Sequence, residues 1–343
     1  MKERVVWVER LRIAAMLSVV MLHVLSKGIS TMEVNTMEWE IYNAGRCFVK
    51  WGVPVFVMIS GNFLLEKKET TAQELKGKIG HIFWVLVFWL CVYAGVSMFN
   101  YYLSHGTLNR TAAHGAVQIL CFGYSHLWYL YMLLGLYVVL PFLRKLTDKK
   151  LIEYYIILFV FFNVFYNILQ NVELDIASDL LKFINLFQIR NMSGFTGYLF
   201  LGYYLCHFEI SKILKKVIYV CGILDFPISI FLTRIHEGNY FITDGNFSVV
   251  NFSTAVFVFL LHKEYVSNLE NSQRKRMMVE KLSMLSFGIY LVHPAILGYV
   301  NDYLNRLDIW CVWKSIICFG IVTIISAFIC ILFKRIPIIK RVM

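Results

Sequence analysis

The stretch from Arg4 to His23, RVVWVERLRIAAMLSVVMLH, carries ionisable side chains into an apolar run that begins a membrane-spanning helix. Arg12 and His23 are eleven residues apart, which places them on one helix face about 16 Å from each other. An ionisable side chain at membrane depth is costly and usually faces a polar cavity or a partner. We therefore predict a functional role for His23. Arg12 fits either a functional role or a simple anchor at the cytoplasmic interface.

The composition of the whole chain indicates the class of protein. Of 343 residues, 59% are hydrophobic and only 16% are charged, and the mean hydropathy is +0.63. Soluble domains carry more charge and hold fewer long apolar runs. We predict an all-α polytopic membrane protein, with one membrane domain over residues 1–343 and no appended soluble domain. The eight cysteines are scattered and form no CxxC pair, so they predict neither a metal site nor a disulfide framework.

Ten apolar runs reach the length of a transmembrane helix. They lie at about residues 11–29, 45–65, 79–103, 124–143, 151–170, 189–207, 216–234, 248–265, 284–300 and 311–333. With the N-terminus inside and alternating spans, 24 of the 33 basic residues fall on the cytoplasmic side. This bias predicts that both termini are cytoplasmic, and it explains the net charge of +11 without a nucleic-acid partner. We expect the helices to surround a central polar cavity.

The second predicted span contains three candidate residues. Arg46 and Lys50 share a helix face, where two like charges need an anionic or polar group opposite them. Snorkelling to the interface is the alternative, and it fits Arg46 better than the deeper Lys50. The small residues Ser60 and Gly61 allow another backbone to come close.

The ninth predicted span carries a polar stripe. Ser286, Tyr290 and His293 recur at i, i+4 and i+7 and therefore share one helix face. The predicted topology places His293 at about the depth of His23, and such groups near the midplane can handle protons. Hydrogen bonding between helices is the alternative for Ser286 and Tyr290.

Aromatic side chains open the fourth predicted span. His126, Trp128 and Tyr129 are expected at the outer face of the membrane. Aromatic residues there are normally interface anchors. A ring in this position can also stack on a sugar or another acceptor.

Four segments, in order along the chain, resemble motifs of the acyltransferase-3 family of membrane proteins. They are ERLRIAAMLSVVMLH (9–23), VPVFVMISGNFLL (53–65), HLWYLYMLLGLYVVLPFL (126–143) and SFGIYLVHPAIL (286–297). The resemblance implies transfer of an acyl group, most often acetyl, from cytoplasmic acetyl-CoA to a hydroxyl of an extracytoplasmic or lipid-linked carbohydrate. The acceptor would be a capsule, exopolysaccharide or other envelope glycan at the cell membrane, without a metal cofactor. A membrane transporter or flippase for a small solute or lipid-linked saccharide is the alternative.

Under this resemblance the candidate residues fall into three groups. The candidates for catalysis are His23, Tyr290 and His293, those for donor binding are Arg12, Lys50 and Arg46, and those for acceptor binding are His126, Trp128, Tyr129, Ser60 and Ser286. His23 would act as base and Arg12 would hold donor phosphates. Family members more often have arginine where this chain has Lys50, and lysine cannot form the bidentate contact that arginine makes with an anion.

Overall fold

The computed structural model describes residues 6–67, 70–171, 174–236, 245–267 and 272–336, and every regular element in these ranges is helical. The α-helices are α1 (Val6–Ile29), α2 (Met37–Val49), α3 (Gly52–Leu64), α4 (Ala72–His105), α5 (Arg110–Phe122), α6 (Trp128–Leu143), α7 (Lys149–Phe159), α8 (Tyr166–Gln170), α9 (Asp175–Leu186), α10 (Arg190–His207), α11 (Lys212–Ile235), α13 (Val249–Leu261), α14 (Gln273–Ser283), α15 (Ser286–Leu304) and α16 (Cys311–Phe333). Four short 3-10 or π segments are η1 (Ser125–Leu127), η2 (Arg144–Leu146), η3 (Val160–Phe165) and η4 (His262–Val266). The predicted all-α class is confirmed.

Short polar side chains and glycine set the ends of the longest helix and its neighbour. The Thr71 hydroxyl accepts a hydrogen bond from the backbone N–H of Glu74, at 3.1 Å, at the start of α4. Gly106 ends α4 in a left-handed conformation with φ of 71°, which glycine adopts without steric cost. Asn109 then caps α5 through its side-chain oxygen. These local signals return the chain from α4 into α5.

The predicted span 45–65 is built from two helices that follow each other closely. α2 ends at Val49 and α3 begins at Gly52, while the intervening residues keep near-helical dihedral angles. Pro54 lies in the first turn of α3, where its missing N–H removes no intrahelical hydrogen bond. The two helices therefore form one apolar run from Met37 to Leu64.

Seven helical runs among the described residues are long and apolar enough to cross a membrane. They are Met37–Leu64, Ala72–His105, Arg110–Leu146, Lys149–Gln170, Lys212–Ile235, Val249–Val266 and Cys311–Phe333. α14 and α15 together pass the same test with a bend of 50° between them, which gives up to eight. The chain is thus a multi-pass membrane protein. The predicted count of ten is not reached by this criterion, because the predicted spans at about residues 11–29 and 189–207 are not among these runs. The cytoplasmic location of both termini stays a prediction.

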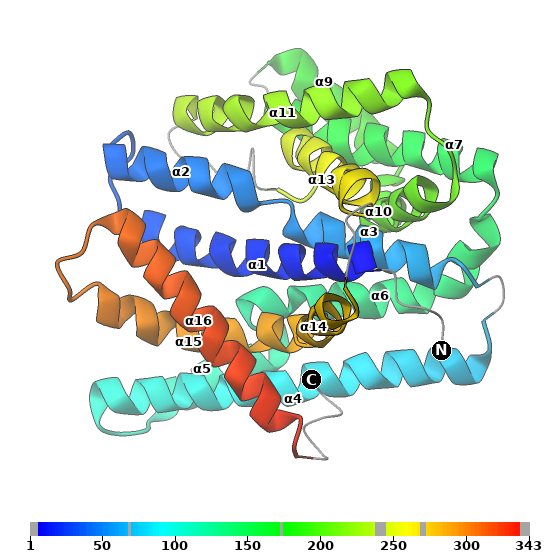
Figure 1. Ribbon diagram of the computed structural model, residues 1–343. Helices are drawn as coiled ribbons and strands as arrows, with labels where there is room; N and C mark the ends of the chain where they lie inside the picture. Colours follow the sequence, from blue (N-terminus) through cyan, green and yellow to red (C-terminus); the bar gives the residue numbers. More distant parts are fainter. Residues whose placement is uncertain (1–5, 68–69, 172–173, 237–244, 268–271, 337–343) are drawn as a thin grey trace.

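Helix α1 lies at the centre of the bundle. It contacts α2, α3, α14, α15 and α16, and Figure 1 shows it running through the middle of the molecule with helices above and below it. Leu11 and Val20 lie on opposite sides of this helix, and both are fully buried, as is Ala15. An ionisable residue on α1 therefore lies among other helices.

Helices α3 and α10 approach each other more closely than any side chain allows. A Cβ atom on Gly61 would lie 2.0 Å from the carbonyl oxygen of Leu199, and one on Gly202 would lie 2.0 Å from that of Met58. Small residues permit such contact between membrane helices. This confirms the expectation that another backbone packs against Gly61.

Candidate active site

The two histidines predicted at equal depth meet in the structure. α1 packs against α15, and the ring centroids of His23 and His293 are 5.0 Å apart. η1 brings His126 to the same place, with its ring centroid 6.0 Å from that of His293. We call His23, His126 and His293 the imidazole cluster.

Backbone hydrogen bonds fix the orientation of two of these rings. Nδ1 of His23 lies 2.8 Å from the carbonyl oxygen of Val19, and Nδ1 of His293 lies 3.1 Å from that of Ile289. A carbonyl oxygen only accepts, so Nδ1 carries the proton in both rings. In the neutral imidazole the lone pair is then on Nε2, the atom that can act as a base.

Burial distinguishes the three imidazoles. His126 is 2% exposed and His293 is fully buried, whereas His23 keeps part of its surface accessible. Within the described residues, Nε2 of His293 has no hydrogen-bond partner. Buried polar atoms are nearly always satisfied, and the exceptions gather where a ligand or a reaction makes use of them. His23 is thus the most accessible of the three imidazoles.

A layer of tyrosines holds the imidazole cluster in place. The hydroxyl of Tyr93 donates to the carbonyl oxygen of Leu291 at 2.7 Å, which ties α4 to α15. The hydroxyl of Tyr290 donates to the carbonyl oxygen of His126, which ties α15 to η1. The rings of Tyr129 and Tyr290 pack edge to face with centroids 5.5 Å apart.

A cavity of about 380 Å³ adjoins this layer. Its lining includes Arg12, Ser60, Tyr129 and Tyr290, all predicted site residues, together with His81. Arg12 and Tyr290 thus line the same cavity, whose lining mixes polar side chains with a larger number of apolar ones, and the central polar cavity stays a prediction.

His23 does not line this cavity. Tyr290 connects the two regions, because it belongs to the cavity lining and its ring centroid is 6.1 Å from that of His293. Arg12 and His23 therefore lie on opposite sides of the tyrosine layer.

The Arg12 side chain is held at its cavity by a short polar chain. Nη1 of Arg12 lies 2.9 Å from Oε2 of Glu9, and the side chain of Arg12 is 32% exposed. The same carboxylate accepts a hydrogen bond from the hydroxyl of Ser283. Glu9 is buried, so it fixes the guanidinium beside the cavity and leaves N–H donors for an anion.

Lys50 and Arg46 lie elsewhere. Nζ of Lys50 donates to the hydroxyl of Ser229 on α11 at 2.5 Å and interacts electrostatically with Asp225. Asp225 also accepts a hydrogen bond from Thr254 on α13. We call Lys50, Asp225, Ser229 and Thr254 the ammonium cluster. Arg46 is buried near the end of α2 and, like Lys50, is absent from the lining of the cavity beside Arg12.

The remaining predicted residues have distinct surroundings. Trp128 is 38% exposed, and its ring centroid is 5.5 Å from that of Phe195. Ser286 is fully buried, and its hydroxyl has no partner among the described residues. Ser60 donates to the carbonyl oxygen of Phe56 at 2.9 Å and reaches the cavity beside Arg12.

Sequence reasoning missed three contributors. Glu9 and Ser283 were not predicted to form the polar chain behind Arg12, and Tyr93 was not predicted beside the imidazole cluster. Tyr93 is one of many aromatic residues in a long apolar run, and nothing local distinguishes it. The acidic character of Glu9 inside an apolar helix was the one usable signal, because a buried carboxylate needs a partner.

The fold and the site define a polytopic membrane protein with a buried imidazole cluster beside an arginine-lined cavity. A family model described as an acyltransferase domain, Acyl_transf_3, matches residues 5–335. The chain therefore belongs to this acyltransferase family, and the resemblance of its four motifs to acyltransferase-3 proteins is confirmed. No curated protein and no solved structure matches the chain.

Proposed function

We propose that this membrane acyltransferase moves an acyl group, in the first instance acetyl, from cytoplasmic acyl-CoA to a hydroxyl of an extracytoplasmic or lipid-linked carbohydrate at the cell membrane. The observation that carries the proposal is the state of His23. Its Nδ1 is hydrogen-bonded to a backbone carbonyl oxygen and its ring is partly accessible. The ring centroid of His293 is 5.0 Å from that of His23. This arrangement suits a general base.

In the proposed reaction Nε2 of His23 takes the proton of the acceptor hydroxyl while the oxygen attacks the thioester carbon. A C–O bond forms, the C–S bond breaks, and the departing thiolate receives the proton from His23. General acid–base catalysis of this kind contributes about 10²–10⁴-fold to a rate. His293 would orient the His23 ring and share its proton.

The donor would enter through the cavity beside Arg12. A guanidinium is well suited to phosphate because it offers several N–H donors in a fixed plane, and Arg12 is positioned by Glu9 at 2.9 Å. Tyr129 and Tyr290 separate this cavity from the imidazole cluster. The thioester end of the donor must therefore pass or displace this tyrosine pair to reach His23.

The acceptor would approach from the side on which His23 is accessible. Trp128 is a candidate platform for a sugar ring, since its partly exposed indole packs on Phe195. An envelope glycan such as a capsule or exopolysaccharide unit is the acceptor class we propose.

Purified protein incubated with radiolabelled acetyl-CoA tests the proposal. We expect saturable donor binding and slow release of CoA, with water replacing the sugar hydroxyl. A transporter or flippase would show neither binding nor thioester cleavage, and that result would overturn the proposal.

A further inference from the structure

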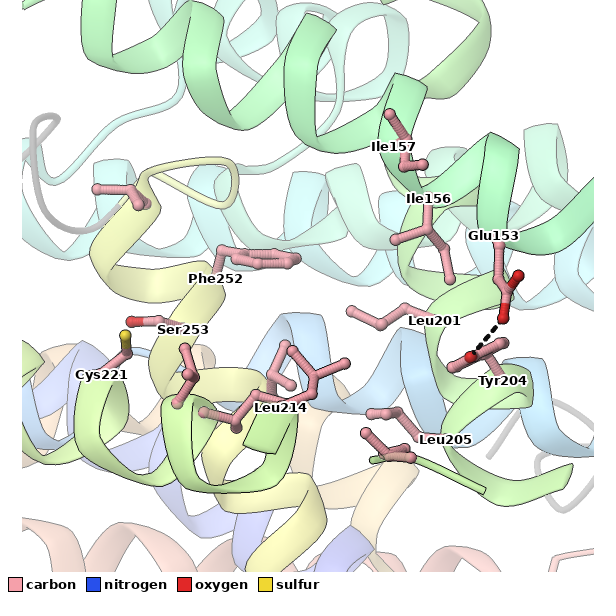
Figure 2. A pocket seen from close by; sticks show the side chains of 15 residues that line it. Glu153, Ile156, Ile157, Leu201, Tyr204, Leu205, Leu214, Cys221, Phe252 and Ser253 are labelled. Carbon is pink, nitrogen blue, oxygen red and sulfur yellow. Dashed lines mark hydrogen bonds between the residues drawn. The ribbon is translucent and has the colours of Figure 1, made fainter. Parts of the chain in front are cut away.

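A second cavity, which shares no lining residue with the cavity beside Arg12, opens between α7 and α11. Its volume is about 620 Å³ and its lining is predominantly apolar. Figure 2 shows Ile156, Leu201, Leu214 and Phe252, from four different helices, around this space. Both α7 and α11 belong to candidate membrane spans, so hydrocarbon is the material available to fill the cavity.

The cavity follows the first turns of α11. Its lining on this helix runs from Leu214 to Cys221, which is about 10 Å along the axis. On the α7 side the hydroxyl of Tyr204 donates to Oε1 of Glu153 at 2.7 Å, as Figure 2 shows. The apolar space therefore adjoins the N-terminal end of α11.

A basic pocket of about 500 Å³ continues the cavity at that end. Ile210 lines both pockets, and Lys212, Lys215 and Lys263 line the basic one. Nζ of Lys263 donates to the carbonyl oxygen of Leu205 at 2.5 Å. Because Leu205 lines the apolar cavity, the Lys263 ammonium marks the junction of the two pockets.

The charges of the basic pocket do not cancel. Two glutamates, Glu209 and Glu264, line it beside the three lysines. Glu264 is paired with Lys215, interacts electrostatically with Lys263, and accepts a hydrogen bond from Tyr219 at 3.0 Å. The Lys263 ammonium has three N–H donors, of which the backbone carbonyl uses one. The pocket therefore retains a positive excess that complements an anion.

We propose that the two pockets together bind one anionic glycerophospholipid, with its phosphate at Lys212 and Lys263 and an acyl chain in the apolar cavity. Basic pockets between membrane helices bind anionic lipid headgroups, and burial of a hydrocarbon chain favours the apolar cavity. A soluble anion has no hydrocarbon chain to fill the apolar cavity. A neutral lipid has no net negative charge to pair with the ammonium groups. The site does not depend on the proposed acyl transfer.

Native mass spectrometry of the purified full chain tests this site. The protein is titrated with phosphatidylglycerol or with phosphatidylcholine of the same acyl chains. We expect one phosphatidylglycerol to bind on the order of tenfold more tightly than phosphatidylcholine. Lys212→Glu should remove this preference, and Cys221→Trp, which fills the apolar cavity, should weaken binding of both lipids.

Matched variants on the same helix control for general charge and bulk. Lys216 and Val220 are exposed and do not line either pocket, so Lys216→Glu and Val220→Trp should bind lipid as the wild type does. Equal affinity for the two lipids would overturn the proposal. An equal loss of phosphatidylglycerol affinity in Lys212→Glu and Lys216→Glu would also overturn it. So would selective binding of a polyprenyl phosphate by a protein that binds no phosphatidylglycerol. Size-exclusion profiles verify that each variant is folded.

Discussion

The imidazole cluster and the ammonium cluster are both groups of polar side chains packed between helices, but they differ in how far their polar atoms are hydrogen-bonded. Lys50 donates to Ser229 and interacts with Asp225, which itself accepts from Thr254. In the imidazole cluster, Nε2 of His293 has no partner in the described part of the chain. A satisfied polar group fixes helices against one another, whereas an unsatisfied one is available for chemistry.

The largest effect is expected when the proposed base in the imidazole cluster is removed. His23→Ala removes the proposed base, so CoA release from acetyl-CoA should fall by about 10²–10⁴-fold, while donor binding persists. His105→Ala, on an exposed histidine of α4, is the matched control. If His23→Ala releases CoA at the wild-type rate, His23 is not the base.

Lys50→Ala tests whether the ammonium cluster stabilises the fold. Removal of the ammonium takes away the donor to Ser229 and the positive neighbour of Asp225, and a buried polar group left without its partner costs about 1–3 kcal/mol. We expect a lower midpoint of thermal unfolding in detergent, with an unchanged KM for acetyl-CoA in the folded fraction. A raised KM with unchanged stability would instead assign Lys50 to donor binding.

Arg12→Ala tests whether the cavity beside Arg12 binds the donor. Loss of a charge-assisted contact to phosphate is worth about 1.5–3 kcal/mol, so the KM for acetyl-CoA should rise at least tenfold with a smaller change in kcat. Dephospho-CoA donors can show which phosphate is involved. Equal KM values for the variant and the wild type would exclude Arg12 from the donor site.

Gly61→Ala perturbs the helix packing without touching either cluster. The added Cβ would meet the carbonyl oxygen of Leu199, and overpacking of this kind costs about 1–3 kcal/mol. Gly95→Ala on α4 is the control because its Cβ would enter open space. Thermal unfolding of the two variants should differ accordingly, and equal midpoints would contradict the close contact of α3 with α10.

The membrane class and the pairing of His23 with His293 were predictable from the sequence. Apolar length predicts most of the spans, although the count of ten is not reached. Helical periodicity with the predicted alternating topology places both histidines at one depth. The close approach at Gly61 was predictable for the same kind of reason, since small residues mark helix contacts.

The neighbours of these residues were not predictable. Which helix packs on which is decided by contacts between similar apolar faces, and the sequence of one helix does not name its partner. Hence neither the placement of Lys50 against α11 nor the arrival of Tyr93 beside His126 followed from local pattern. The tyrosine layer between Arg12 and His23 likewise depends on the packing of α6 against its neighbours.

The central claim is that a donor held beside Arg12 delivers its acyl group to His23 past Tyr129 and Tyr290. A structure of the protein with a non-hydrolysable acetyl-CoA analogue measures this directly. The account predicts phosphates next to Arg12 and the acyl carbonyl beyond the tyrosine pair, within about 3–3.5 Å of a hydroxyl or water that hydrogen-bonds to Nε2 of His23. An analogue bound at the ammonium cluster, or one whose acyl end points away from the imidazole cluster, would contradict it.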